Sequence, residues 1–495
     1  MRHLAQEGFV IPSSQILNDI LIPRFYDPRI ELQLEELSAT HTLYSLDELV
    51  ERDFIQHDHG DYVPKIHYGT GSIPYLRTSD LANWELKASP KHGVSEEIFN
   101  EYGPAQDVRT GDILFVHEGT YLIGAVAMIT KYDGPALYQH HLAKFRVLES
   151  APFSAFFLLA AFESDIVQLQ IRSKQFSADI IDSVVGRLGQ VIIPVPKDRR
   201  KLKKIEEEAE ASIVGRARIK EELSHMFREV DEVLRGVSDK PLKQILSWSP
   251  GDRYAGKTHF LNYRTGFNAF MRPSSEIVND VLLPRYYDPF IEDTVHRCTA
   301  VSKMVSLGEL VEDGFLDMTT GDEIGRLTYG TGTIPFVRTS DFGSWELKRE
   351  AKQGVSQEVY EEWGPHQDAR AGDILLVRDG TYLIGSSVLL CEADLPLLYC
   401  GGIIRLRCLR PDELSPAMLF TLLNLPITFR QIRNKQFTRD VIDTLGNRLE
   451  EVLIPIPSER RTSLAVTEET GGRIQLRNDM RGELERLVSC IYSHR

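Results

Sequence analysis

Short apolar runs bounded by glycine, proline and aspartate make up most of the first part of the chain. Five of them have the length and flanking residues of β-strands, and these are 72–78 (SIPYLRT), 111–119 (GDILFVHEG), 120–130, 141–148 and 189–196. The segment 153–175 instead has apolar residues at mixed spacings of three and four, which predicts one helix. The pattern therefore predicts a mixed domain of strands and helices.

The same pattern returns 261 residues later, in the same order and register. GTGSIPYLRTSD at Gly69 returns as GTGTIPFVRTSD at Gly330, and GDILFVHEGTYLIG at Gly111 returns as GDILLVRDGTYLIG at Gly372. The offset is also kept by PSSQILNDILIPRFYDP, which begins at Pro12, and by QIRSKQFSADIID, which begins at Gln170. The chain thus contains two copies of one long module rather than a short-period repeat.

A long charged segment with an apolar stripe follows each copy. After the first copy, the stripe advances mostly by three, four or seven positions and consists of Leu202, Ile205, Ala209, Ile213, Ile219, Leu223, Met226, Val230 and Val233. After the second copy it consists of Val466, Ile474, Met480, Leu484, Leu487 and Ile491. Gly471 and Gly472 predict a weakened helix before residue 473. Each helix packed on its own module is one interpretation, but two equivalent helices favour pairing with each other.

These patterns predict an α+β protein. It has two homologous α/β modules in a pseudo-two-fold arrangement, joined by an antiparallel pair of long coiled-coil-like helices. The predicted modules are 1–198 and 271–459, the helices are 199–236 and 460–495, and a linker spans 237–270.

Composition and charge narrow the class of protein. The chain is 42% hydrophobic and 26% charged, and it has neither a run long enough to span a membrane nor an apolar signal core, so we expect a cytoplasmic protein. The five cysteines form no CxxC pair, which argues against disulfides and structural zinc. The net charge of −15 means that binding to nucleic acid would need local basic patches and a basic partner.

The sequence predicts a non-catalytic chain without a cofactor of its own. It has no HExxH or GxSxG motif, and YDPR and YDPF lack the second proline with which amino-methyltransferases hold a target base. The pair His140–His141 is replaced by Gly401–Gly402 in the second copy, which disfavours a metal or catalytic role. GDRYAGKT (Gly251–Thr258) matches the phosphate-binding loop, but no buried strand precedes it and no suitable helix follows. We expect a glycine-rich linker loop there, with a nucleotide-binding protein as the alternative.

The repeated strings, and VIIPVP followed by a long charged helix, resemble the target-recognition domain of type I restriction-modification specificity subunits. The resemblance covers essentially the whole chain, in the family's order of recognition domain, spacer helix, recognition domain, spacer helix. PVPKDRRK and PIPSERRT replace the family's glutamine-containing entry to the helix, and the linker is longer than that family predicts.

The resemblance implies that each module reads one half of a bipartite site in double-stranded DNA and that the helices set the gap. It also implies that two DNA adenine methyltransferase subunits dock on the helices, with a restriction and translocation subunit as a further partner. S-adenosylmethionine, ATP and magnesium would then be bound only by these partners. The expected docking residues are Ile205, Ile213, Leu223, Ile474 and Leu484. The alternative is an acidic scaffold or DNA mimic that binds a methyltransferase.

Polar residues kept in both copies are candidates for contacts with the DNA backbone. They are Arg77, Thr78, Ser79, Thr120, Tyr121, Arg172, Lys174 and Gln175, with Arg338, Thr339, Ser340, Thr381, Tyr382, Arg433, Lys435 and Gln436 as their counterparts. For Arg77 and Arg338, a buried ion pair with Asp80 and Asp341 is the structural alternative.

Polar residues that differ inside the kept frame are candidates for reading bases. Three places qualify: His117 and Glu118 against Arg378 and Asp379, His140 and His141 against Gly401 and Gly402, and Lys65 and His67 against Arg326 and Thr328. Arginine recognises guanine and a carboxylate accepts from cytosine, each contributing about 1–3 kcal/mol of discrimination.

Overall fold

The computed structural model describes residues 10–16, 20–119, 121–178, 181–237, 273–278, 281–349, 351–380, 382–439 and 442–492. Thr120, Thr381, the loop Gly251–Thr258 and all but the first residue of the predicted linker lie outside the described residues. The chain divides into two compact units. The N-terminal unit comprises the described residues up to 218 together with those from 479 onward, and the C-terminal unit comprises those from 219 to 478.

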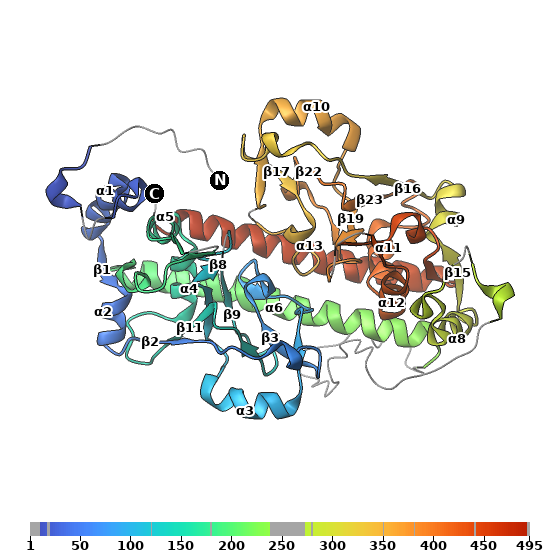
Figure 1. The fold of residues 1–495 in the computed structure, drawn as a ribbon, viewed down its shortest axis with the longest axis horizontal. Helices are drawn as coiled ribbons and strands as arrows, with labels where there is room; N and C mark the ends of the chain where they lie inside the picture. Colours follow the sequence, from blue (N-terminus) through green and yellow to red (C-terminus); the bar gives the residue numbers. More distant parts are fainter. Residues whose placement is uncertain are drawn as a thin grey trace. The chain divides into compact units, whose positions relative to one another are not determined.

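The N-terminal unit is built from short strands and helices followed by the start of one long helix (Figure 1). Its helices are α1 (Pro28–Ser38), α2 (Leu46–Glu51), α3 (Glu96–Gln106), α4 (Ala155–Glu163), α5 (Asp165–Ser173) and the first part of α6 (Arg199–Leu234). Its strands are β1 (His41–Ser45), β2 (Ile55–His59), β3 (Ile73–Leu76), β4 (Leu81–Ala82), β5 (Glu85–Leu86), β6 (Gly93–Val94), β7 (Ile113–Val116), β8 (Glu118–Gly119), β9 (Val126–Met128), β10 (Leu137–Tyr138), β11 (Leu142–Val147), β12 (Phe176–Ala178), β13 (Ile181–Ser183) and β14 (Ile192–Pro196).

The C-terminal unit repeats this order of elements. Its helices are α8 (Pro289–Cys298), α9 (Leu307–Glu312), α10 (Gln357–Gln367), α11 (Pro416–Leu423), α12 (Pro426–Asn434) and most of α13 (Arg460–Cys490). Its strands are β15 (Ser302–Ser306), β16 (Leu316–Thr320), β17 (Ile334–Val337), β18 (Gln353–Val355), β19 (Ile374–Val377), β20 (Asp379–Gly380), β21 (Ser387–Leu389), β22 (Leu398–Tyr399), β23 (Ile403–Cys408), β24 (Phe437–Arg439), β25 (Ile442–Thr444) and β26 (Leu453–Pro457).

The two units share one sheet topology. The largest sheet has the order β2-β11-β7-β9 in the N-terminal unit and β16-β23-β19-β21 in the C-terminal unit, and its neighbouring strands are antiparallel. A three-stranded sheet, β12-β13-β8, recurs as β24-β25-β20. The sequence duplication is therefore a duplication of structure, and the predicted mixed fold of strands and helices is confirmed.

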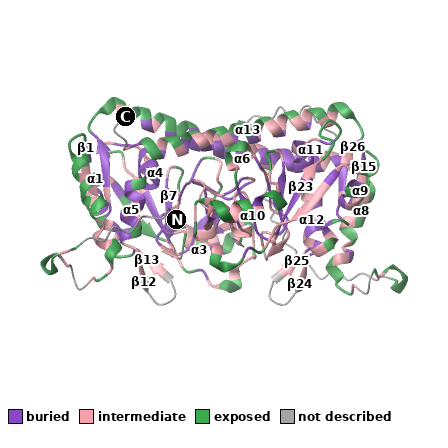
Figure 2. Ribbon diagram, turned by 90° about the horizontal axis from the view of Figure 1, so that it is seen from above, coloured by how far each residue is buried: buried purple, intermediate pink, exposed green. Residues whose placement is uncertain are grey.

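The apolar run in β7 is continuous because both faces of its sheet are covered. Ile113 and Phe115 belong to a core that includes α4, whereas Leu114 and Val116 belong to a second core on the other face. All four residues are buried, and Figure 2 shows β7 and α4 in the buried colour. A strand covered on both faces has no polar alternation, which explains why this run is apolar throughout.

The single helix predicted over 153–175 is wrong, because the segment forms α4 and α5 with Ser164 between them. Ser164 is extended, with ψ of 151°, and so it ends one helix before the next begins. The second copy contains the signal that the first lacks: Pro426 occupies the first turn of α12, and the residue before a proline avoids the helical conformation. The strand predicted over 120–130 is also shorter, since only Val126–Met128 pairs.

The long helices α6 and α13 follow the last strand of each copy. The side chain of Asp198 accepts the N–H of Arg200 at 2.8 Å, at the start of α6. The helix α13 runs through Gly471 and Gly472 without interruption, although the sequence predicts a weakened helix there. Tertiary packing outweighs the low helix propensity of glycine, because Thr470 beside them is fully buried and its hydroxyl lies 2.8 Å from that of Thr421.

The two long helices pair antiparallel within each unit. As the residue number rises along α6 it falls along α13: in the N-terminal unit Gly215 approaches Met480, and in the C-terminal unit Glu222 forms a 3.2 Å ion pair with Arg473 while Met226 contacts Thr470. Figure 1 shows α6 in green and α13 in red. The expected pairing of the helices with each other is thus present in the structure.

Each unit completes its core with residues from both long helices. In the N-terminal unit, Ile205 and Ile213 from α6 and Leu484 and Ile491 from α13 belong to the same core as α4. In the C-terminal unit, Phe227 from α6 contacts the rings of Trp345 and Phe420, with centroids 5.3 and 6.2 Å away. The start of each helix therefore packs on the copy that precedes it, and its end packs on the other copy.

One arginine in the middle of each helix is buried against its unit. Arg216 and Arg477 lie 261 positions apart in the sequence and are each 1% exposed. Arg216 Nη2 lies 3.9 Å from Glu85 Oε1, and Arg477 Nη2 lies 3.5 Å from Glu346 Oε1. Removing either partner would leave a buried charge uncompensated, a change that typically costs about 3–5 kcal/mol.

Among the described residues, no helix is both long and apolar enough to cross a membrane.

We expect Leu484→Ala to destabilise the N-terminal unit although the residue lies near the C-terminus of the sequence. Leu484 is fully buried in the core that holds α4 and β7, and such a truncation costs about 2–5 kcal/mol. Amide hydrogen exchange should become faster in β7 and β11. Leu476→Ala is the matched control, because Leu476 is 41% exposed on the same helix. Faster exchange confined to α13 would contradict the shared core.

Candidate nucleic-acid interface

Two of the three variable places meet in the N-terminal unit. His117, between β7 and β8, donates from Nε2 to the carbonyl oxygen of His140 at 2.9 Å. Glu118 Oε2 lies 2.8 Å from Nδ1 of His141. His117 and Glu118 thus form one polar cluster with His140 and His141, although more than a strand separates the two pairs in the sequence.

The equivalent places also meet in the C-terminal unit, with different chemistry. Arg378 Nη2 lies 3.0 Å from Asp379 Oδ2 and donates to the carbonyl oxygen of Gly401 at 3.1 Å. Its Nη1 donates to the hydroxyl of Thr320 at 3.2 Å. Asp379 in turn accepts from the hydroxyl of Thr444 at 2.5 Å. The guanidinium is therefore held by its own unit, and a guanine would compete with Asp379 for it.

Two further histidines belong to the N-terminal cluster and were not predicted. His57 and His59 lie on β2, where the second copy has Met318 and Thr320. The ring centroids of His57 and His59 are 4.8 Å apart, and those of His59 and His117 are 4.9 Å apart. Comparing the copies along β2 would have found them, since IQHDH faces LDMTT at the kept offset.

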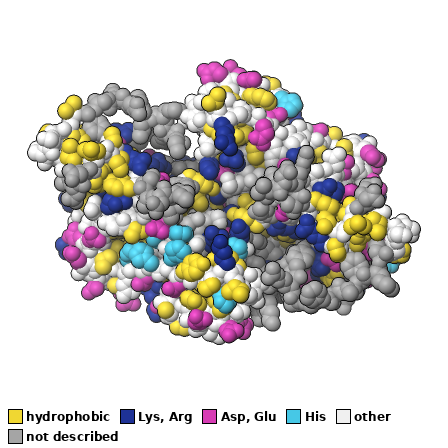
Figure 3. Space-filling model, viewed as in Figure 1, with side chains coloured by type: hydrophobic (Ala, Val, Ile, Leu, Met, Phe, Trp, Pro, Cys, Tyr) yellow, Lys and Arg dark blue, Asp and Glu magenta, His cyan; other side chains and the backbone are white. Residues whose placement is uncertain are grey.

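Burial makes His57 and His117 poor bases. It lowers the pKa of His57 and of His117 to about 4 in each case, with a further contribution from the neighbouring His59. Burial, followed by His141, also lowers the pKa of His140. The side chains of His57 and His117 therefore act at neutral pH as uncharged donors and acceptors. Figure 3 shows a group of histidine side chains over the strands of this unit, and in the described parts of the chain no cluster has metal-binding geometry.

The third variable place lies apart from the other two. Lys65 and His67 bound the short 3₁₀ helix Lys65–His67, and Arg326 and Thr328 bound its counterpart Arg326–Thr328. Lys65 and Arg326 are exposed. Within the described parts of the chain, no hydrogen bond or ion pair connects them to the clusters around Glu118 and Asp379.

The aspartates of the repeated RTSD strings hold the backbone rather than the arginine side chains. Asp80 is fully buried, and its carboxylate accepts the N–H of Arg77 at 2.9 Å and that of Lys91 at 3.1 Å. Asp341 accepts the N–H of Arg338 at 2.9 Å in the same way. Burial raises the pKa of both carboxyl groups, and these backbone N–H groups oppose the rise. The aspartates therefore do not form the buried side-chain ion pair with Arg77 and Arg338 that was the structural alternative.

The two arginines freed by this arrangement differ in their surroundings. Arg77 Nε donates to Gln139 Oε1 at 3.1 Å, and its Nη1 lies 3.3 Å from His92 Nε2. The second copy has cysteine and glutamine at the positions of these partners, and across the described chain the half-buried guanidinium of Arg338 has no hydrogen bond or ion pair. The candidates Thr78, Ser79, Thr339 and Ser340 are half-buried in the adjoining 3₁₀ turns.

The kept residues at the end of α5 and α12 partly serve the fold. Gln175 Nε2 donates to Asp182 at 2.6 Å, and Gln436 donates to Asp443, so each glutamine ties the strand after its helix to the next strand. Arg433 Nη2 donates to the carbonyl oxygen of Tyr382 at 2.5 Å. Among the remaining candidates, Arg172 is exposed, Tyr121 is 38% exposed, and Lys174 and Lys435 are half-buried.

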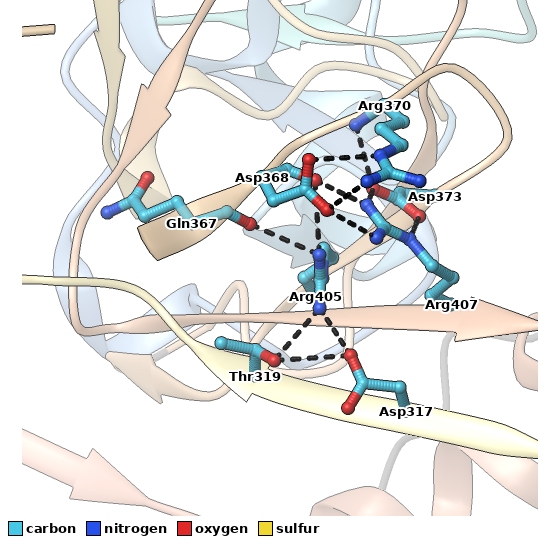
Figure 4. Close-up of polar contacts among 8 residues, drawn as sticks. All are labelled: Asp317, Thr319, Gln367, Asp368, Arg370, Asp373, Arg405 and Arg407. Carbon is cyan, nitrogen blue, oxygen red and sulfur yellow. Dashed lines mark hydrogen bonds and ion pairs between the residues drawn. The ribbon is translucent and has the colours of Figure 1, made fainter. Parts of the chain in front are cut away.

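Other basic residues are neutralised and therefore poor candidates for phosphate contacts. Figure 4 shows Arg407 on β23 donating to Asp373 and Asp368 at 2.7 and 2.8 Å, while Arg405 on the same strand binds Asp317. The side chain of Asp373 is 3% exposed. This network fixes the sheet to the end of α10.

The N-terminal unit keeps the same network. Arg146 donates to Asp112 and Asp107 at 2.7 and 2.9 Å, and Lys144 takes the place of the second arginine, 3.3 Å from Asp58. The hydrogen bond from Arg146 lowers the pKa of Asp107 to about 2, together with one from Arg109. Because both copies contain it, the network belongs to the shared frame.

The five residues expected to dock a partner are not available to one. Ile205, Ile213, Leu223, Ile474 and Leu484 are all between 0% and 5% exposed. Their side chains fill the cores of the two units, which corrects that expectation. A docking protein would have to use the exposed positions of α6 and α13 instead.

In the comparisons with known proteins, several solved structures resemble this chain, but their similarity to it is low. No protein-family model and no curated protein sequence matches the chain. The crystal structure of the type I restriction-modification S subunit from M. genitalium is 13% identical, with 90% of this chain and 92% of that chain covered and a TM-score of 0.30.

Two further structures come from type I systems. One is described as the structural basis of complex assembly and conformational transition of the type I R-M system. It is 15% identical to this chain, the match covers 92% of this chain and 96% of that chain, and the TM-score is 0.27. The HsdS subunit from Thermoanaerobacter tengcongensis is 17% identical, covers 89% and 95%, and has a TM-score of 0.24. TM-scores this low establish neither the fold nor the function of this chain.

The buried histidines predict that the N-terminal unit loses stability in acid. His57 and His117 are neutral when folded, with pKa values of about 4, whereas unfolded histidine has a pKa of about 6.5. The unfolded state therefore binds more protons, and stability falls as the pH drops from about 6.5 to about 4.

The matched variant is His57→Met, which introduces the residue of the second copy. Thermal unfolding at about pH 7.5 and about pH 5 should show a smaller loss of Tm in this variant than in the wild type. The exposed His296 provides the control, and His296→Asn should leave the loss unchanged. An equal acid-induced loss in wild type and His57→Met would contradict this assignment.

Proposed function

We propose that the chain is the DNA sequence-specificity subunit of a type I-like restriction-modification complex or a related defence complex. Each unit would read one half of a bipartite site in double-stranded DNA, and the chain itself would perform no catalysis. The proposal joins the resemblance of the repeated strings to the duplicated structure. The partners would be two DNA adenine methyltransferase subunits, with a restriction and translocation subunit as a further one.

One observation carries the proposal: the same frame occurs twice, and its polar residues change at places that meet in space. His117, Glu118 and His141 form one constellation in the N-terminal unit, and Arg378 and Asp379 form another at the same positions of the C-terminal unit. A frame kept in two copies with different polar groups is what two unlike half-sites require. A single chain also frees the site from being palindromic, unlike the site of a symmetric dimer.

The acidic net charge of the chain is consistent with a complex in which partner subunits bind most of the phosphates. The net charge of the chain is −15, and Arg146 and Arg407 are already paired to carboxylates, so its overall charge does not favour binding to phosphates. The methyltransferases would supply much of the phosphate clamp, together with S-adenosylmethionine, and a translocation subunit would bind ATP and magnesium. The complex would then act in the cytoplasm, where its DNA is.

The decisive experiment measures methylation with and without this chain. The chain and its methyltransferase should be co-expressed, and genomic adenine methylation read by sequencing. We expect methylation of one bipartite motif only when the chain is present. An acidic DNA mimic would instead reduce methylation when present, and that result would refute the proposal.

Arg378→Ala should relax base preference in one half of the motif only, because Arg378 belongs to one unit.

The helix pair would act as the ruler between the half-sites. The helix α6 has 36 residues, a length of about 54 Å, of which we expect about 30–40 Å to separate the recognition surfaces. This is about one turn of B-DNA, at 34–36 Å, and leaves a non-specific gap of roughly 5–8 base pairs.

Matched insertions test the ruler. Because the helices pair antiparallel, four residues should be inserted into both, near Ala217 in α6 and near Asn478 in α13, so that the pairing is kept. Each insertion adds about 6 Å and a rotation of about 40°. The two half-sites should stay the same while the gap grows by about one or two base pairs, at about 3.4 Å each. Four residues near Ile213 alone should disrupt the pair. An unchanged gap in the double insertion would rule out the helices as the ruler.

A further inference from the structure

Two cations lie over two aromatic rings where α5 ends in the N-terminal unit. Lys174 Nζ is 5.3 Å from the ring centroid of Phe25, and Arg187 Cζ is 3.9 Å from that of Phe176. The two rings are 5.8 Å apart. These four residues, Phe25, Lys174, Phe176 and Arg187, form what we call the cation–aromatic cluster.

The cluster is fixed directly to the variable place around Glu118. Arg187 Nε donates to the carbonyl oxygen of Lys174 at 3.0 Å, and its Nη2 donates to that of Ser183 at 3.1 Å. The hydroxyl of Ser183 in turn donates to Glu118 Oε1 at 3.3 Å. Glu118 lies on β8 of the small sheet β12-β13-β8, and the two cations lie just before and just after the hairpin β12-β13 of the same sheet.

Within the described part of the N-terminal unit, no carboxylate balances the positive charge of this cluster. Among the residues that the structure describes, neither Lys174 nor Arg187 forms an ion pair with a carboxylate. Burial, and then the nearby charge of Arg187, lower the pKa of Lys174. Burial also lowers the pKa of Arg187. Two half-buried cations that destabilise each other would be stabilised by an anion placed between them.

The C-terminal unit has the same cluster but supplies its own anion. Lys435 Nζ lies 4.6 Å from the ring of Tyr286, and Arg448 Cζ lies 4.0 Å from that of Phe437. Here Glu451 Oε2 is 2.7 Å from Lys435 Nζ, and it also accepts from the hydroxyl of Tyr286 at 2.5 Å. The carboxylate of Glu451 thus lies next to the lysine, at the position where the first copy has the uncharged Gln190.

Two substitutions between the copies account for this difference. Position 190 is glutamine where position 451 is glutamate, and position 25 is phenylalanine where position 286 is tyrosine. The first copy therefore lacks both the carboxylate and the hydroxyl that binds it. The two changes occur together, which is the pattern expected if the first copy keeps the site open.

We infer that the cation–aromatic cluster of the N-terminal unit binds a phosphodiester of the DNA backbone, and that Glu451 closes the equivalent site in the C-terminal unit. The inference rests on the proposed function, since it places the phosphate beside the surface that would read bases. Lysine and arginine are the usual donors to phosphate oxygens, and a contact of this kind positions the duplex without reading its sequence. The two half-sites would then be held unequally.

Reciprocal exchange of the anion tests this assignment. The full chain, alone and with its methyltransferase, should be titrated against a mixed-sequence duplex by fluorescence anisotropy over a range of salt concentrations. Gln190→Glu should reduce the steepness of log K against log salt by about 0.9, the value for one lost phosphate contact, and Lys174→Gln should do the same. Glu451→Gln should increase the steepness by about the same amount. Gln190 and Glu451 are both exposed, so neither exchange disturbs a core.

Lys435→Gln is the matched control, and it should leave the steepness unchanged because Glu451 already neutralises Lys435. If the wild type binds the duplex and neither Gln190→Glu nor Glu451→Gln alters the steepness, the phosphate site is refuted while the proposed function stands. If the wild type binds no duplex DNA even with its methyltransferase, the proposed function itself is refuted and the phosphate site with it.

Discussion

Each unit depends on one constraint: its core is closed only when segments of both long helices pack into it. The apolar stripe of α6 fills the N-terminal core with its first half and the C-terminal core with its second, and α13 does the reverse. Arg216 and Arg477 add a buried charge at the middle of each helix, held by Glu85 and Glu346. Such a charge is costly to leave unpaired, so it fixes the helix at one register against the unit.

This constraint separates the residues that keep the frame from those that can change. The networks around Arg146 and Arg407 are the same in both copies, as are the buried turns at Asp80 and Asp341. The places that differ are polar clusters supported by these parts. His117 is buried and the equivalent Arg378 is half-buried, so the change between them alters the hydrogen bonds of the cluster while the strands beneath it stay the same.

Much of the fold could be predicted from the sequence because the duplication shows which positions are interchangeable. The strands around Ile113 and Leu142 and the stripes of both helices follow directly from apolar spacing. The break at Ser164 was missed because its signal, Pro426, is present only in the other copy. The predicted second long helix is present as α13 and continues through Gly471 and Gly472, where the tertiary contacts of Thr470 offset the low helix propensity of glycine.

The candidate site was predicted less well, because sequence spacing does not reveal which partner a polar side chain uses. Asp80 binds backbone N–H groups instead of the side chain of Arg77, and only its burial in the structure shows this. The expected docking residues follow an apolar stripe, but a stripe gives no information on whether it faces its own chain or another. His57 and His59 were not predicted, although the comparison of IQHDH with LDMTT along β2 would have found them.

The order in which this protein is synthesised acquires a particular meaning from the shared core. When the ribosome has completed the first copy and α6, the N-terminal unit still lacks Leu484, Val488 and Ile491, which belong to its core. The second half of α6 needs only the second copy and the first part of α13, which are translated before Leu484. The first unit to be translated is therefore the last that can reach its full stability. Its hydrophobic core stays incomplete until the last part of α13 has left the ribosome. A premature stop after the second copy would therefore remove Leu484, Val488 and Ile491 from the core of the N-terminal unit.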